Sequence, residues 1–150
     1  MATTDDVKKL RDRTGISVMQ CKQALDEANG DFDKALRILE KKGAGSAAKK
    51  ASRELGAGTV AAYVHANKEM AGVVLLQSET DFVAKNEEFA RLAYDIAMHV
   101  AAANPEDIVA LLEQPFIKDP EKTIRNLIDT ATQKFGERIE ITEARRISVR

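Results

Sequence analysis

The chain has 150 residues, of which 44% are hydrophobic, with two tyrosines, five phenylalanines and no tryptophan. Its 23 basic and 24 acidic residues nearly balance, which excludes binding to nucleic acid through a strong overall charge. Cys21 is the only cysteine, so neither an internal disulfide nor a thiolate metal cluster can form. The sequence shows neither a signal peptide nor an apolar run long enough to span a membrane, so a cytoplasmic location is expected.

Residues 1–43 are predicted to form a bundle of three short helices. Thr3 or Thr4 begins the first, Ser17 with Gln20 forms a capping-box pair at the second, and Asp31 caps the third, which is expected to end at Lys41-Lys42-Gly43. The apolar residues expected inside the bundle recur at helical spacing: Val7, Leu10, Cys21, Leu25, Ala28, Phe32, Ala35, Leu36 and Leu39.

Residues 44–58 are interpreted as a tether because they are rich in glycine, alanine and basic residues. Lys49, Lys50 and Arg53 could touch phosphate, but a short basic linker without aromatic neighbours is more often simply solvated. We therefore expect no direct contact with nucleic acid, and we place the domain boundary in this segment.

Residues 59–150 are predicted to form an α+β core. Residues 60–65 alternate with a period of two, 67–69 provide a turn and 72–77 return as an apolar strand, so an antiparallel hairpin is expected. Apolar residues from Phe89 to Ala101 then predict a long helix across the sheet, ended by Asn104-Pro105.

Three further elements are expected in the rest of the core. A short helix covers residues 106–113, and a second helix opens at Asp119-Pro120 and ends at Gly136. The tail is strand-like, and four of its apolar residues share one parity: Ile139, Ile141, Ile147 and Val149. One hairpin plus this tail makes a small sheet whose apolar run and open edge need more cover than two helices provide, so a homodimer is expected.

Residues 79–89 are interpreted as the functional segment, because they connect the most apolar strand to the longest helix. Asn86 can cap that helix, and Phe82 is either a plug for the protein's own core or a probe for a partner. No catalytic motif is present, and His65 and His99 lack further ligands at metal spacing, so neither an enzyme nor a metal or cofactor site is expected.

Two spaced patterns resemble the family of translation elongation factor Ts, the nucleotide-exchange factor of elongation factor Tu. The first pattern combines Arg13-Thr14-Gly15, Met19, Cys21-Lys22, Ala24-Leu25 and Gly30-Asp31, and the second is the nearly uninterrupted run Thr80-Asp81-Phe82-Val83-Ala84-Lys85-Asn86-Glu87-Glu88-Phe89. The resemblance covers essentially the whole chain. It implies that the N-terminal bundle is similar to a ubiquitin-associated fold.

The resemblance also implies the roles of particular residues. In the family the aromatic residue of the second pattern enters the nucleotide-binding domain of elongation factor Tu, so Phe82 would be a probe accompanied by Asp81. The expected contact segment is Thr80, Asp81, Phe82, Val83, Ala84, Lys85 and Asn86. Val18, Met19 and Lys22 are expected contacts of the bundle with the same partner.

The chain departs from the longer family members, which carry a second core subdomain, a helical hairpin and a C-terminal helix. Short members are expected to supply the missing subdomain by pairing two chains. Ser78 also stands where the family pattern has cysteine. Two classes of function stay open: an exchange factor, and an adaptor that holds a partner helix or peptide on the bundle without exchange activity.

Overall fold

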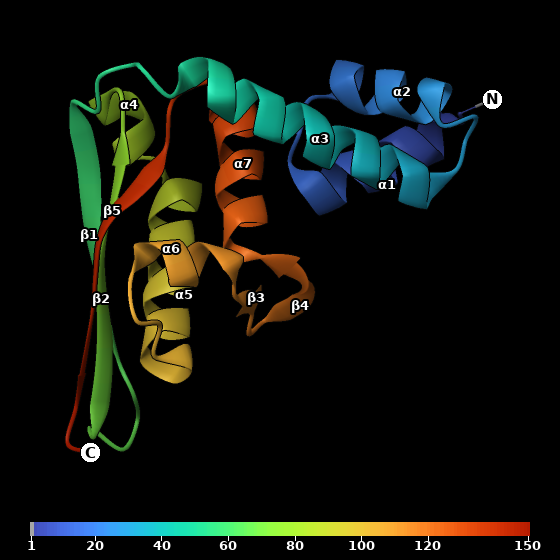
Figure 1. Cartoon of the computed structure of the whole chain (residues 1–150). Helices are drawn as coiled ribbons and strands as arrows, with labels where there is room; N and C mark the ends of the chain where they lie inside the picture. The colour runs from blue at the N-terminus through green and yellow to red at the C-terminus, as the bar shows by residue number, and fades with distance from the viewer. Residues whose placement is uncertain (1) are drawn as a thin grey trace.

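The computed structural model describes residues 2–150. It contains a helical N-terminal part and a mixed core, so the expected α+β class is confirmed (Figure 1). The elements follow in the order α1 (Thr4–Thr14), α2 (Val18–Glu27), α3 (Phe32–Lys50), β1 (Ala57–Val64), β2 (Met70–Ser78), α4 (Asp81–Ala84), α5 (Glu87–Ala103), α6 (Ile108–Glu113), β3 (Pro115–Phe116), β4 (Asp119–Thr123), α7 (Ile124–Phe135) and β5 (Glu140–Ser148).

The first three helices begin at the predicted caps. Thr3 accepts a hydrogen bond from the Asp6 backbone amide and the Asp6 carboxylate accepts one from the Thr3 amide, while Ser17 and Asp31 each cap the helix that follows them. The expected capping box at Ser17 is incomplete, because the Gln20 side chain accepts from Gln133 instead of from the Ser17 amide. Such caps satisfy amides that have no partner inside the helix. The buried residues of this part form their own cluster: Val7, Leu10, Ile16, Cys21, Ala24, Leu25, Ala28, Ala35 and Leu39.

The expected end of the third helix at Gly43 is wrong, because α3 continues to Lys50. Gly43 is buried, and a Cβ built on it would lie 3.2 Å from the Asp129 carbonyl oxygen of α7, so glycine permits a close approach of the two helices. The alanines after Gly43 are strong helix formers. The segment expected to be a tether is therefore helical up to Lys50, and β1 already begins at Ala57.

The predicted antiparallel hairpin is confirmed and belongs to a three-stranded sheet in the order β1-β2-β5. Helix α5 packs on one face of this sheet, as expected, while the opposite face carries no helix of the described residues (Figure 1). A Cβ on Gly72 would overlap the Ala97 carbonyl oxygen of α5, so glycine is needed for this helix to lie so close to β2. The core that α5 forms with the sheet, α6 and α7 includes Leu76, Phe89, Ile96, Leu111 and Ile124.

The C-terminal strand departs from simple alternation. The register places Leu76 opposite Ile141 but Leu75 opposite Glu143, so Thr142 is an extra residue that forms a bulge. One extra residue exchanges the two faces of a strand. As a result Ile141 is buried against α5 while Ile147 is exposed on the other face, and the expectation that these residues share one face is wrong.

The segment before α7 is also different from the prediction. Residues 119–123 do not open a helix at Asp119-Pro120; they form β4, which pairs with β3 in a small ribbon. α7 begins instead at Ile124, because Thr123 and Asn126 form a capping box. The expected end at Gly136 is confirmed, with a φ of 71° at that residue. Within residues 2–150, no helix combines the length and apolar character needed to cross a membrane.

Candidate partner-binding site

Phe82 lies on α4, a single turn directly after β2, and 87% of its surface is exposed. Its two neighbours Val83 and Ala84 are buried in the core, so the backbone of the turn is anchored while the ring projects outward. An exposed phenylalanine on an anchored turn leaves a large apolar surface in water. Phe82 is therefore not a plug for its own core.

Hydrogen bonds fix α4 at both ends. The Thr80 side chain caps it by accepting from the Val83 amide at 3.4 Å, and Thr59 of β1 donates its hydroxyl to the Ala84 carbonyl at 2.7 Å. Asn86 then caps α5, as predicted, and accepts from the Glu88 amide at 2.8 Å. The segment is consequently a turn of defined shape rather than a loose loop.

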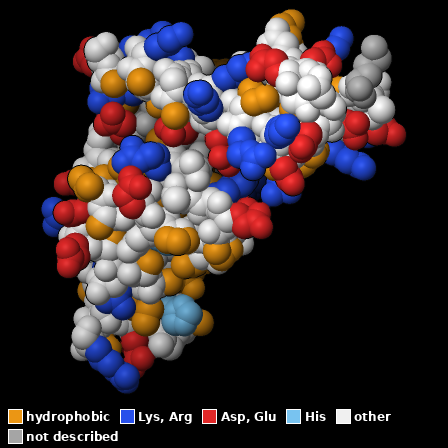
Figure 2. All heavy atoms as spheres, turned by 45° about the vertical axis from the view of Figure 1, so that its right-hand side comes forward, with side chains coloured by type: hydrophobic (Ala, Val, Ile, Leu, Met, Phe, Trp, Pro, Cys, Tyr) orange, Lys and Arg blue, Asp and Glu red, His pale blue; other side chains and the backbone are white. Residues whose placement is uncertain are grey.

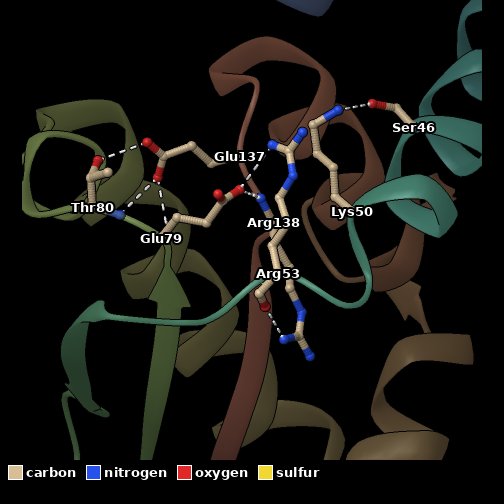
Figure 3. A network of polar contacts seen from close by, with 7 residues as sticks. All are labelled: Ser46, Lys50, Arg53, Glu79, Thr80, Glu137 and Arg138. Carbon is tan, nitrogen blue, oxygen red and sulfur yellow. Dashed lines mark hydrogen bonds and ion pairs between the residues drawn. The ribbon is translucent and has the colours of Figure 1, made fainter.

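Glu137 provides the support that the sequence did not reveal (Figure 3). Its Oε1 accepts from the backbone amides of Glu79 at 3.1 Å and Thr80 at 3.0 Å, and its Oε2 accepts from the Thr80 hydroxyl at 2.7 Å. The Glu79 carboxylate in turn accepts from the Arg138 amide. We refer to Glu79, Thr80, Glu137 and Arg138 as the clasp.

Two further contacts extend the clasp. The Arg138 guanidinium donates to the Arg53 carbonyl, just beyond α3, and the Arg53 guanidinium lies 3.4 Å from the Glu79 carboxylate (Figure 3). Ser78, buried at the end of β2, donates its hydroxyl to the Thr80 carbonyl at 3.0 Å. The serine that departs from the family pattern thus contributes a hydrogen bond to the turn that carries Phe82.

Periodicity could not have revealed Glu137, because 57 residues separate it from Thr80. The available local signal is its position directly after Gly136, where the chain leaves α7 in a left-handed conformation. That conformation shows where a helix ends but not what the next side chain will contact.

The predicted residues of the bundle lie on a second surface. Val18 and Met19 open α2 and are 49% and 71% exposed, and Lys22 is exposed one turn later. Figure 1 shows α2 and α4 near opposite ends of α3, so the structure does not bring these residues together with Phe82. The two surfaces are instead held apart by α3 and by its packing on α7.

His99, one of the two histidines considered as possible ligands, is part of the core. His99 is fully buried: its Nδ1 lies 3.3 Å from the Ile117 amide, which can only donate, so Nε2 carries the proton and donates to Gln114 at 2.9 Å. Burial lowers the pKa of His99, which favours this neutral form. No group of three or more His, Cys, Asp or Glu side chains within residues 2–150 is placed to hold a metal ion.

Charged side chains of both signs are mixed over the visible surface (Figure 2), so a partner would have to be recognised through local contacts rather than through a broad charged area. Lys, Arg, Asp and Glu side chains are interspersed over the bundle and the core in the view of Figure 2, without a broad area of one sign. At the turn itself, Asp81 directly before Phe82 and Lys85 three residues after it are both exposed and have opposite charge. The turn thus exposes an apolar ring together with one acidic and one basic side chain, which suits docking on another protein.

Comparison with known proteins identifies the family. The sequence model described as "Elongation factor TS" matches residues 46–109 and 79–150. Similar proteins include elongation factor Ts of Thermodesulfovibrio yellowstonii, 41% identical over 98% of this chain and 96% of the relative. The elongation factors Ts of Acetivibrio thermocellus and Thermosipho melanesiensis are 39% and 41% identical, over 94% and 91% of this chain and 86% and 92% of the relatives.

These matches place the chain among the translation elongation factors. More particularly, the chain belongs to the elongation factor Ts family. The alignments with the first two relatives extend over 192 and 186 positions, more than the 150 residues of this chain, so the relatives carry residues that this chain lacks.

Proposed function

We propose that this chain is a guanine-nucleotide exchange factor that binds elongation factor Tu with GDP and promotes release of the nucleotide. Phe82 would insert between apolar side chains of the partner's nucleotide-binding domain and disturb the site that holds magnesium and phosphate. The observation that carries the proposal is the 87% exposure of Phe82 on a turn anchored by buried neighbours. No covalent bond changes in this process, so the chain would act without being an enzyme.

The energy required is within reach of such a contact. A thousandfold weakening of GDP binding requires about 4 kcal/mol of preferential binding to the nucleotide-loosened state. Burying one phenylalanine side chain supplies roughly 1.5–3 kcal/mol. Phe82 would therefore provide a large share, and contacts of Asp81 and Lys85 with the partner would add to it.

The other residues of the expected contact segment divide into two groups by their surroundings. Asp81 and Lys85 are exposed and are proposed to touch the partner beside Phe82. Thr80 and Asn86 cap helices, and Val83 and Ala84 are buried. We assign these four to building the turn rather than to direct contact through their side chains.

The bundle is proposed to contribute affinity rather than the exchange step. Val18, Met19 and Lys22 form an exposed apolar and basic surface at the start of α2. Because this surface is distant from the Phe82 turn, its loss should weaken binding without changing the maximal rate of release. A Met19→Asp variant with an increased KM for elongation factor Tu and an unchanged maximal rate is the expected result.

A homodimer is proposed on the sheet face that α5 leaves uncovered. Four large aliphatic side chains are exposed on or beside this face: Val60, Val64, Ile147 and Val149. The register sets Val60 beside Leu75 and Ala71 beside Ile147, so the apolar side chains are adjacent across the strands. A second copy could cover this face by stacking its own sheet in the same way.

The direct test is release of fluorescent GDP from elongation factor Tu with and without this protein. We expect faster release, and GDP should weaken binding of this protein by the same factor as this protein weakens binding of GDP, because coupling is reciprocal. Binding without any change in release rate would instead identify a passive adaptor. The cytoplasmic location expected from the sequence stays a prediction.

A further inference from the structure

We propose that Glu137 is a positioning residue for nucleotide exchange: through the clasp it holds the turn that carries Phe82 in the orientation the partner must meet. This inference rests on the proposed function of Phe82. It assigns a role to a residue outside the two patterns that resemble the family, and that role comes from contacts between residues far apart in the sequence.

The need for this support follows from where the sheet ends. The last residue of β2 paired with β1 is Ser78, opposite Ala57, so the amides of Glu79 and Thr80 lie beyond the sheet. An amide that leaves the sheet needs an acceptor where it is half-buried, as at Glu79, while at the exposed Thr80 water could accept but would not fix the direction of the backbone. Glu137 accepts from both amides with one oxygen.

The second oxygen of Glu137 acts on the helix that bears Phe82. It accepts from the Thr80 hydroxyl, and the same hydroxyl oxygen accepts from the Val83 amide at the start of α4. Hydrogen bonds to a carboxylate are stronger than those between neutral groups. The carboxylate therefore fixes the rotamer of the cap and, through it, the direction of α4.

The clasp also fixes the turn relative to α7. Glu137 follows the left-handed residue Gly136, and the Arg138 amide donates to the Glu79 carboxylate. Glu137-Arg138 after α7 and Glu79-Thr80 before α4 are therefore joined by several hydrogen bonds. α7 packs along α3, the third helix of the N-terminal bundle. The two proposed contact surfaces are thus held at a fixed separation by groups that lie outside both of them.

The test compares Glu137→Ala and Glu137→Gln in the full chain, each with and without Phe82→Ala. Glu113→Ala is the matched control, because Glu113 also accepts two hydrogen bonds, from Arg125, but lies on α6 away from the turn. Three quantities are measured: the KM and maximal rate of GDP release from elongation factor Tu, hydrogen exchange of the Glu79 and Thr80 amides, and the melting temperature.

We expect Glu137→Ala to lower the maximal release rate about tenfold, equivalent to about 1.4 kcal/mol, with little change in KM. The Glu79 and Thr80 amides should exchange faster, Glu137→Gln should lie between wild type and alanine because it keeps one acceptor, and Glu113→Ala should match wild type. In the Phe82→Ala background, Glu137→Ala should lower the rate no further, since it acts through Phe82.

Two results would overturn the assignment while leaving the proposed function of Phe82 in place, and a third would overturn both. If Glu137→Ala lowered the rate by the same factor in both backgrounds, Glu137 would support the fold in general. If Phe82→Ala slowed release but both Glu137 variants released GDP normally, the clasp would be dispensable. Normal release by Phe82→Ala itself would refute the proposed function, and the role of Glu137 in it, while amide exchange would still report on the clasp in the free protein.

Discussion

At the scale of single residues, His99 shows how a buried polar side chain joins several elements. It lies on α5, donates to Gln114 after α6 and accepts from the Ile117 amide beside β3. Protonation of Nδ1 would replace this acceptor with a donor that faces another donor. The neutral form is therefore part of the folded structure.

His99 predicts how stability depends on pH. Because burial lowers its pKa in the folded state, the unfolded chain binds more protons as the pH falls below about 6.5, the ordinary histidine value. The stabilisation is thus present above that pH and is lost as the pH falls towards the folded-state pKa. The free energy of unfolding should decrease by at most about 1.4 kcal/mol per pH unit from this group.

Urea unfolding of the wild type and His99→Gln at pH values on both sides of this range measures the effect. The variant should be less stable at neutral pH but should show a weaker dependence on pH. Contributions of other groups cancel in the difference, including that of Asp129, whose pKa is raised by burial. Parallel curves for the two proteins would show that His99 does not carry the effect.

At the scale of elements, the sequence predicted those features that depend on neighbouring residues. Thr3, Ser17, Asp31 and Asn86 cap helices as expected, and alternation identified the hairpin. Features set by distant contacts were missed. Gly43 was interpreted as a helix end because its packing on α7 cannot be seen in the sequence.

The same limit explains the other differences. The bulge at Thr142 exchanges the faces of β5, and no local rule marks it, because pairing with β2 creates it. For the site, the residues around Phe82 left plug and probe open, and the family resemblance implied a probe; the 87% exposure of the side chain excludes the plug. The role of Glu137 could not be predicted, because its partner Thr80 lies 57 residues earlier in the sequence.

The corrected length of α3 predicts opposite effects at two nearby glycines. Gly45 is exposed in the helix, and a Cβ added to it would meet nothing within 4 Å, so Gly45→Ala should stabilise the protein by about 0.5–1 kcal/mol. A Cβ on Gly43 would lie 3.2 Å from the Asp129 carbonyl oxygen, which is backbone and cannot move aside as a flexible side chain can, so this crowding should outweigh the same helix gain and Gly43→Ala should destabilise the protein by up to about 2 kcal/mol. Chemical denaturation measures both; equal, negligible effects would indicate a loose tether instead of a helix.

At the scale of the whole molecule, the bare face of the sheet predicts self-association. Val60→Glu would place a charge from each copy in the proposed interface and should weaken the dimer more than about tenfold. Val109→Glu is the control, because Val109 is similarly exposed but lies on α6. Light scattering at micromolar concentration should show a dimer for wild type and control; a wild-type monomer would contradict the proposal.

The whole molecule can therefore be described as two proposed contact surfaces connected by α3 and α7. The bundle presents Met19 at one end of α3, the core presents Phe82 at the other, and α7 with the clasp connects them. An arrangement of this kind can place an apolar probe at a fixed position relative to a docking surface. Exchange would then depend on how rigidly the probe is held as well as on its chemistry.

The central claim is that Phe82 acts on a partner and not in its own core, and one variant tests it most directly. Phe82→Ala should keep the melting temperature of the wild type, because the ring is 87% exposed, while GDP release from elongation factor Tu per folded molecule should slow at least about tenfold. Truncating a core phenylalanine would instead cost about 3–5 kcal/mol of stability. A large fall in melting temperature with normal release per folded molecule would contradict the claim.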